Sequence, residues 1–182
     1  YPGHPEAELA LVKLYRATGE QRYLDLAKYF VDERGQKPHY FDLEAVARGE
    51  DPRNYWAQNY RYCQADVPVR DQHTAVGHSV RACYLYAGMA DVAAETDDAT
   101  LVDVCRSLWD DITQHQMYVT GALGPAHTNE GFTFAYDLPN ENAYAETCAS
   151  IALAFWAQRM FRLDPDSRYI DDCARRVLNS IE

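Results

Sequence analysis

The amino-acid sequence predicts an all-α protein, specifically part of an (α/α)6 toroid, in which an inner ring of helices is enclosed by an outer ring. Two observations lead to this prediction. Helical hairpins recur three times along the 182 residues, and the two helices of each hairpin differ in the distribution of their apolar residues. Three hairpins make about half of such a ring. We therefore expect residues 1–182 to be a partial toroid domain, with N- and C-terminal portions outside the chain.

Each hairpin consists of two helices joined by a short polar turn with a helix-capping residue, as antiparallel neighbours require. Residues 21–25 and 167–171 also resemble each other, which supports a repeat. A helical solenoid or an irregular bundle is the alternative. The predicted hairpins are 5–18 with 21–34, 74–95 with 99–115, and 144–163 with 167–181.

The first helix of a hairpin is apolar on nearly all sides, as residues 82–89 and 151–157 show. The second helix has a single apolar stripe, as in 101–112. A helix that is apolar all round is buried, whereas a striped helix faces solvent on its far side. The first helices therefore belong to the inner ring and the second helices to the outer ring. Trp109 and Trp156 are predicted to lie in the core.

Three long segments lead into the inner helices: residues 2–6, 36–73 and 117–143. Because all inner helices of a toroid point the same way, these segments should meet at one end of the ring. Polar residues from distant sequence positions would then converge there. The segments are rich in aromatic residues, which suit either stacking against a sugar or packing of the loops on the core. These are Tyr40, Phe41, Tyr55, Trp56, Tyr60, Tyr62, Tyr118, Phe132, Phe134 and Tyr136.

Composition excludes several classes of partner. The formal net charge is −11, and Lys and Arg form no cluster, which argues against nucleic acid or an anionic membrane surface as a partner. No run approaches the roughly 20 apolar residues that a membrane span needs. No secretory leader is visible, and a cytoplasmic location is favoured, although the first residues are more typical of the middle of a domain.

The five cysteines are widely spaced and form no CxxC pair. An odd number with this spacing argues against a disulfide framework, and most are expected to be buried thiols inside helices. They are Cys63, Cys83, Cys105, Cys148 and Cys173.

Glu146 and Cys148 lie in the first turn of the third inner helix. A thiol there experiences the positive end of the helix dipole, which favours the thiolate. Thiolate and carboxylate are both zinc ligands, so the two residues could form half of a zinc site. From spacing alone, the simpler alternative is favoured, in which the glutamate serves the helix dipole and the cysteine packs.

Three further residues are candidates for chemistry. Glu130 lies in a loop beside aromatic residues and glycine, where a carboxylic acid can have a raised pKa and act as a general acid. The alternative is an exposed loop carboxylate. His4 and His78 lie at the starts of the first and second inner helices, and either could hydrogen-bond a sugar hydroxyl or be a core histidine with its partners satisfied.

Several segments, in this order, resemble the catalytic domain of glycoside hydrolase family 127, the β-L-arabinofuranosidase family. The likeness covers nearly the whole chain, and the last block is the most specific. The matching stretches are 3–6 with the helices that follow to residue 35, 76–82, 118–121, 129–132 and 136–149.

This resemblance implies a role for each candidate. Glu130 matches the general acid/base of the family, and Glu146 and Cys148 match two zinc ligands. His4 and His78 match active-site histidines that contact the sugar. The implied substrate is an L-arabinose-containing glycan or glycoside, and the full-length protein could be a homodimer.

The resemblance also implies a retaining mechanism with a cysteine nucleophile, whose thiolate zinc would stabilise. The nucleophile and a further zinc ligand are cysteines that the family places later than residue 182, and we do not assign either role to Cys173. We therefore expect the 182-residue chain alone to be inactive and to bind zinc weakly. The alternatives are another sugar-processing toroid, such as an epimerase or an unsaturated-uronide hydrolase, and a non-catalytic carbohydrate-binding fragment.

Overall fold

The computed structural model describes residues 1–54 and 60–171. In these residues the regular structure is helical, and β-pairing is limited to isolated bridges. A π-helical turn, Ile112–Gln116, follows α5, and two short 3-10 turns occupy Pro52–Asn54 and Val69–Asp71. The α-helices are α1 (Ala7–Thr18), α2 (Gln21–Glu33), α3 (Tyr40–Ala47), α4 (Ser79–Thr96), α5 (Ala99–Asp111) and α6 (Thr147–Leu163).

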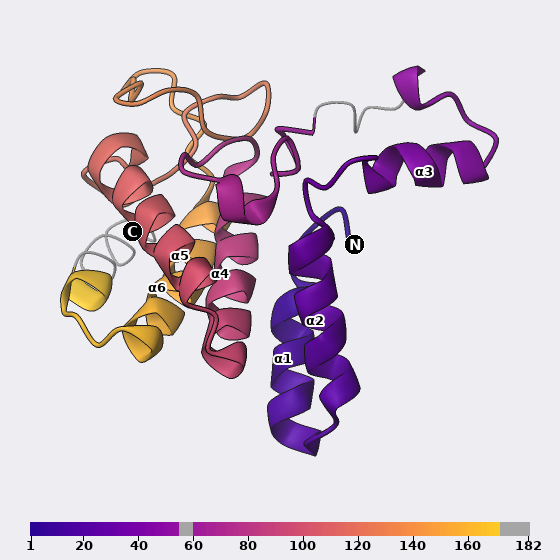
Figure 1. Ribbon diagram of the computed structural model, residues 1–182. Coiled ribbons are helices and arrows are strands. Elements are labelled where there is room, and N and C mark those ends of the chain that lie inside the picture. Colours follow the sequence, from indigo (N-terminus) through magenta and orange to yellow (C-terminus); the bar gives the residue numbers. More distant parts are fainter. Residues whose placement is uncertain (55–59, 172–182) are drawn as a thin grey trace.

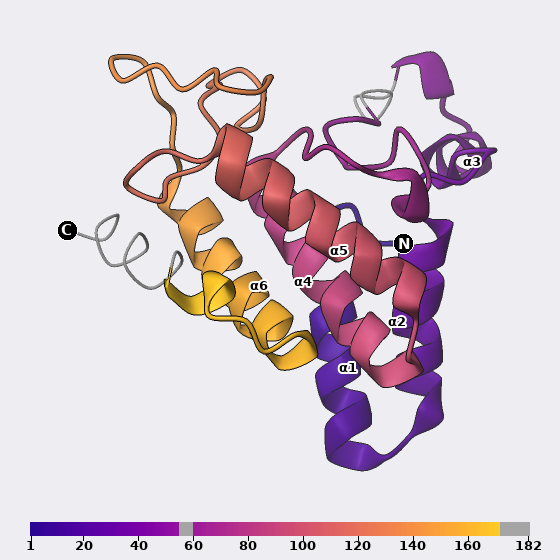
Figure 2. The same ribbon diagram turned by 60° about the vertical axis from the view of Figure 1, so that its left-hand side comes forward.

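Helix α4 occupies the centre of the arrangement. The α1–α2 hairpin packs against one side of it, and α5 and α6 pack against the other (Figures 1 and 2). Helix α3 extends away from the hairpins at one end of the molecule (Figure 1). The all-α prediction is confirmed for the described residues, and α1 with α2 and α4 with α5 form the first two predicted hairpins. Most of the second helix of the third predicted hairpin lies outside the described residues.

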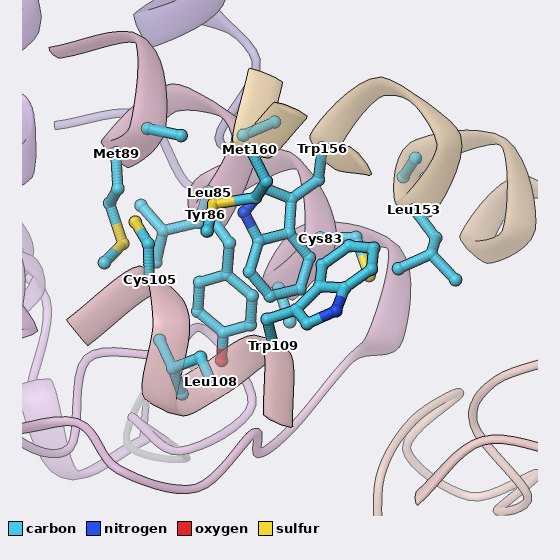
Figure 3. Packing of buried hydrophobic residues seen from close by; sticks show 14 of the residues in the cluster. Cys83, Leu85, Tyr86, Met89, Cys105, Leu108, Trp109, Leu153, Trp156 and Met160 are labelled. Carbon is cyan, nitrogen blue, oxygen red and sulfur yellow. The ribbon is translucent and has the colours of Figure 1, made fainter. Parts of the chain in front are cut away.

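The core lies where α4, α5 and α6 meet. Helix α4 is buried on nearly all sides, whereas α5 buries one stripe, as predicted for an inner and an outer helix. Trp156 lies between Tyr86 and Trp109, with ring centroids 5.1 and 5.0 Å away (Figure 3). Tyr169 packs against Trp109, with ring centroids 5.1 Å apart. Burying a large apolar side chain stabilises the fold by roughly 1.5–3 kcal/mol. The predicted core positions of Trp109 and Trp156 are confirmed.

Helix α6 differs from the prediction of an inner helix that is buried all round. Its apolar residues Ile151, Phe155 and Phe161 are 39, 46 and 39% exposed, while Leu153, Trp156 and Met160 on the other side are buried. The reason is that α6 packs mainly on α4, so that one face of α6 meets no other helix in the described part of the chain.

The predicted helix starts at residues 74 and 144 are wrong, since α4 begins at Ser79 and α6 at Thr147. The backbone before each helix is left-handed, with φ of +70° at Gly77 and +46° at Ala145, and a right-handed helix cannot pass through such a residue.

Other boundaries agree more closely. Asp98 caps α5 by accepting hydrogen bonds from the backbone N–H groups of Thr100 and Leu101. Of the last predicted helix, 167–181, residues 168–171 are helical, and the remainder, with Cys173, lies outside the described residues. Tyr55 and Trp56 lie outside them too. Helix α3 was not predicted. None of the helices in the described ranges is both long and apolar enough to cross a membrane.

Candidate active site

The segments that precede α1, α4 and α6 meet at one end of these helices, as the toroid model predicts (Figure 2). The ring of His4 lies 6.1 Å from the ring of His78, and His78 Nε2 lies 3.1 Å from Glu130 Oε2. The other carboxylate oxygen, Oε1, accepts a hydrogen bond of 3.1 Å from the hydroxyl of Tyr144. Four residues from three distant segments therefore form one cluster. We call residues 1–6, 60–78 and 117–146 the loop layer.

The Glu130 loop is attached directly to the start of α4. The backbone N–H and the hydroxyl of Ser79 both donate to the carbonyl of Glu130 at 3.1 Å, and the N–H of Phe132 donates to the carbonyl of Gly77 at 2.9 Å. Glu130 itself has a φ of +50°, which is unfavourable for a residue with a Cβ. The structure thus holds the backbone of this carboxylate in a strained conformation beside His78.

His78 is the N-cap of α4. Its Nδ1 accepts hydrogen bonds from the backbone N–H groups of Val80 at 3.2 Å and Arg81 at 3.4 Å. The residue is only 7% exposed. Burial, together with the positive charge of Arg81, lowers the pKa of His78, although Glu130 acts in the opposite direction. The lowered pKa and the role of Nδ1 as an acceptor both favour the neutral imidazole.

His4 is more accessible, with a side chain 37% exposed. Burial lowers the pKa of His4, while Glu6, whose carboxylate lies 3.4 Å from Nδ1, raises it. Two arginines hold the backbone just before His4: Arg34 donates to the carbonyl of Pro2 at 2.8 Å, and Arg81 donates to the carbonyl of Gly3 at 2.9 Å. The position of His4 thus depends on both arginines.

Glu146 and Cys148 lie side by side at the start of α6, near the same cluster. Cys148 is exposed, whereas Cys63, Cys83 and Cys105 are buried. Cys83 and Cys105 lie inside helices, as predicted, and Cys63 lies in a turn. A hydrogen bond with Glu146 raises the pKa of Cys148, and burial and the Glu146 charge add to this effect. The expectation that the helix dipole alone favours a thiolate here is therefore wrong, because the neighbouring carboxylate outweighs it.

Glu146 and Cys148 have the donor atoms that zinc accepts, an oxygen and an adjacent sulfur. Two ligands are, however, fewer than a zinc site needs. Within residues 1–54 and 60–171, no group of three or more His, Cys, Asp or Glu side chains is arranged to hold a metal. Zinc sites normally use three or four protein ligands. Glu146 and Cys148 can therefore supply only part of a site.

Sequence reasoning missed the residues that support the site. Tyr144 belongs to a stretch of recognised similarity, but nothing in its spacing indicates a hydrogen bond to Glu130. Gln64 is fully buried, and its side-chain amide donates to the carbonyls of Val76 at 2.9 Å and His78 at 3.2 Å. Arg34, also fully buried, lies 3.5 Å from the carboxylate of Glu8. Gln64 and Arg34 thus donate to backbone carbonyls distant in sequence, and Tyr144 donates to a distant carboxylate. The apolar periodicity of the sequence does not report such contacts.

The aromatic residues of the long segments divide into two groups. Phe41, Tyr118 and Phe132 are buried and pack the loops on the core, the simpler of the two interpretations. Phe134 and Tyr136 are each 70% exposed in the loop layer.

The fold and the site together define a domain of the α/α toroid class with a carboxylate-centred site at one end of its inner helices. A comparison with protein families identifies it further. The chain belongs to glycoside hydrolase family 127: the family model "Beta-L-arabinofuranosidase, GH127 catalytic domain" matches residues 1–181.

Known relatives agree with this assignment. A non-reducing end β-L-arabinofuranosidase of Bifidobacterium longum subsp. longum is 46% identical over 179 residues, which are 97% of this chain and 27% of the relative. The crystal structure of a GH127 β-L-arabinofuranosidase from Geobacillus stearothermophilus T6 matches with a TM-score of 0.93 and 52% identity, over 97% of this chain and 28% of that one.

A second solved structure, a GH127 β-arabinofuranosidase, matches with a TM-score of 0.83 and 43% identity, over 97% of this chain and 25% of that one. The chain thus spans about a quarter of the length of the relatives it matches.

Proposed function

We propose that the full-length protein is a β-L-arabinofuranosidase, a retaining glycosidase that releases L-arabinofuranose from β-L-arabinofuranosides. The observation that supports this most directly is the carboxylate of Glu130, 43% exposed and held between His78 and Tyr144 where three segments meet. Membership of the family and the activities of two relatives support the substrate class.

In this proposal, Glu130 is the general acid and then the general base. It protonates the glycosidic oxygen as the bond to the anomeric carbon breaks, and it later takes a proton from the water that releases the sugar. A cysteine thiolate is the nucleophile, as in the mechanism that the family resemblance implies. His4, which is partly exposed, would bind a sugar hydroxyl. Both ring nitrogens of the buried His78 already have partners, so we propose that His78 acts through Glu130 rather than on the sugar directly.

We also propose that the protein holds a zinc ion through Glu146 and Cys148, with other ligands that this chain does not provide. Zinc, when bound, would favour the deprotonated form of thiol ligands. Within the chain itself, the adjacency of the Cys148 sulfur and the Glu146 carboxylate and the exposure of the thiol support this assignment.

The acid role of Glu130 is tested by Glu130→Gln in the full-length protein. Gln cannot donate a carboxylic proton, so hydrolysis of aryl β-L-arabinofuranosides with poor leaving groups should fall by roughly 10²- to 10⁴-fold, and that of activated ones much less. Glu141→Gln, at an exposed loop position, is the control and should change neither. Equal losses on both kinds of substrate would remove the acid role.

Metal analysis of the full-length protein tests the zinc proposal. Cys148→Ala should lower the zinc content, whereas Cys105→Ala, at a buried thiol, should not. A wild-type protein without zinc would instead favour a metal-free sugar-processing toroid. Stabilisation by sugar without any turnover would favour a non-catalytic binding protein. The 182-residue chain alone should be inactive. If it turned over substrate at the rate of the full-length protein, this would contradict the proposal that other parts of the protein complete the active site.

A further inference from the structure

The two ring nitrogens of His78 have different partners, and this determines where its proton lies. Nδ1 accepts hydrogen bonds from the backbone N–H groups of Val80 and Arg81, so Nδ1 bears no hydrogen. A neutral imidazole has one N–H, which must then be on Nε2. Nε2 lies 3.1 Å from Glu130 Oε2. His78 is therefore a hydrogen-bond donor to that oxygen and cannot accept a proton from it without giving up the helix cap.

The other oxygen of Glu130 has a partner of a different kind. Oε1 lies 3.1 Å from the hydroxyl of Tyr144. A phenol both donates and accepts hydrogen bonds, whereas the N–H of a neutral imidazole only donates. A proton on Oε2 would point at the Nε2–H of His78, while a proton on Oε1 would be accepted by the Tyr144 oxygen. Only Oε1 can thus be protonated without losing a hydrogen bond.

We propose that the helix cap of His78 makes Oε1 the oxygen of Glu130 that holds the catalytic proton, and that Tyr144 is the positioning residue for this proton. This inference rests on the proposed acid role of Glu130. It adds which oxygen acts, which residue orients the proton, and why a residue that caps α4 also affects catalysis.

The backbone supports the same geometry. The carbonyl of Glu130 is held by Ser79, the residue after His78, and the carbonyl of His78 is held by Gln64. The ring of His78 lies edge-on to Tyr62, with centroids 5.4 Å apart. Imidazole and carboxylate are therefore fixed to the same point of the fold, which keeps Oε2 occupied.

The proton balance follows directly. In the first step the Oε1–H bond breaks as the glycosidic oxygen gains the proton and the electron pair of its bond to the anomeric carbon, and the Tyr144 hydroxyl turns from acceptor to donor. Glu130 is then a carboxylate that accepts from both His78 and Tyr144, which is the arrangement in the structure. In the second step water returns a proton to Oε1.

Tyr144→Phe in the full-length protein is the first test. The substitution keeps the ring, which lies edge-on to His127 at 5.4 Å, and removes only the hydroxyl. Turnover of substrates with poor leaving groups should fall on the order of tenfold, a part of the general-acid contribution, while activated substrates change less. In a Glu130→Gln background, Tyr144→Phe should add no further loss. An equal loss on all substrates, or an additive loss in that background, would overturn the positioning role.

The variants His78→Asn and His78→Ala separate the role of His78 as the cap of α4 from its effect on the proton of Glu130. Asn is among the best N-cap residues and Ala among the poorest, so the Asn variant should keep the wild-type melting temperature and the Ala variant should not. Both should lose turnover on poor leaving groups. A His78→Asn variant with wild-type turnover on these substrates would contradict the proposal.

The tautomer is open to a direct measurement that does not depend on activity. In ¹⁵N-histidine-labelled protein, the signals absent from His78→Asn belong to His78. They should show a protonated Nε2 and a bare Nδ1 at neutral pH, and a protonated Nδ1 would refute the inference. Equal losses for Glu130→Gln on all leaving groups, with this tautomer intact, would instead place the failure in the proposed acid role.

Discussion

The core around α4 and the loop layer at its N-terminal end are stabilised in different ways. In the core, Tyr86, Trp109 and Trp156 pack against one another through non-directional contacts between buried rings (Figure 3). The loop layer is held by buried polar side chains: Arg34, at the end of α2, donates hydrogen bonds to the carbonyls of Pro2 and Cys63, and Gln64 donates to carbonyls 12 and 14 residues further along the chain. The stability of the core thus depends on how well apolar side chains fill its volume, and the geometry of the site depends on individual polar contacts.

This difference follows from what each region must satisfy. A helix pairs its own backbone groups, so its side chains are free to pack. The loop layer pairs its backbone groups only in part, through turns and isolated bridges, and buried carbonyls such as that of Val76 take donors from side chains. It also contains strained backbone, at Glu130 and Ala145, which have a Cβ and a positive φ. We expect mutations in the core to act on stability, and mutations in the loop layer to act on activity as well.

Trp156→Ala should give the largest loss of stability. Trp156 is fully buried between two aromatic rings, and truncation of a buried aromatic residue costs about 3–5 kcal/mol. Equilibrium urea unfolding of the full-length protein measures the loss. Phe155→Ala, at the adjacent residue that is 46% exposed, should cost about 1 kcal/mol or less. Similar losses for the two variants would show that the face of α6 bearing Phe155 is buried in the full-length protein.

Arg34→Met should be nearly as damaging, but through polar contacts. It leaves the buried carboxylate of Glu8 without its counter-ion and the carbonyls of Pro2 and Cys63 without a donor. Breaking a buried pair on one side costs about 3–5 kcal/mol. Activity of the folded fraction should fall as well, because His4 follows Pro2.

A double variant tests the origin of that loss. Arg34→Met with Glu8→Leu removes both charges and should recover much of the stability but not the activity, since Pro2 still lacks its donor. The control Arg22→Met, in a pair with Glu20 whose arginine is 70% exposed, should cost less than about 1 kcal/mol. If the double variant regained full activity, Arg34 would not be positioning the segment that contains His4.

The contrast between the core and the loop layer also explains which features could be predicted from the sequence. Apolar periodicity gave the hairpins and the buried Trp109 and Trp156, because it reports which face of a helix leaves water. The short helix α3 is buried only at Phe41 and Ala45, which is too few positions to show a period. The starts of α4 and α6 depend on single left-handed residues, which the apolar pattern does not contain.

The convergence of the candidate site residues could be predicted from the sequence, but their contacts could not. His4, His78 and Glu130 do converge, as the common direction of inner helices requires. The hydrogen bond of Tyr144 to Glu130 depends on the path of a loop 14 residues long, and no local pattern specifies that path. The pKa of Cys148 was expected to fall because only the helix dipole was considered, and the contact with Glu146 reverses the direction.

Gly131→Ala, in the loop layer, should affect activity more than stability, in contrast to substitutions in the core. A Cβ at this position would lie 1.8 Å from the carbonyl oxygen of Gly77 and 2.8 Å from the Cα of His78, so the Glu130 loop must move away from α4. We expect a loss of about 1–3 kcal/mol in unfolding free energy, as for an overpacked core site. Turnover should fall as far as in Glu130→Gln.

The matched control is Gly3→Ala, also in the loop layer, where the nearest atom to an added Cβ is a side-chain nitrogen of Arg81 at 3.8 Å, an ordinary contact. Steady-state kinetics and urea unfolding of both variants give the comparison. Wild-type turnover in Gly131→Ala would mean that the distance between Glu130 and His78 does not matter for catalysis.

Asp98→Asn should have the smallest effect, because Asp98 lies at the turn between α4 and α5, at the opposite end of α4 from His78. Burial tends to raise the pKa of Asp98, but hydrogen bonds from Thr100 and Arg70 outweigh it and lower the pKa to about 2. A carboxylate with a lowered folded-state pKa stabilises the fold above the ordinary pKa of 3.8, and this contribution disappears as the pH falls towards 2. Asn keeps the helix cap and removes only the charge, so the loss in unfolding free energy at pH 7 should be about 1 kcal/mol.

In urea unfolding from pH 7 to 2, the stabilities of wild type and Asp98→Asn should converge at the acid end. The exposed neighbour Asp97, changed to Asn, should follow wild type throughout. A drop in turnover of Asp98→Asn in the full-length protein at neutral pH would contradict this expectation, because a polar contact at the far end of α4 would then also act on the site.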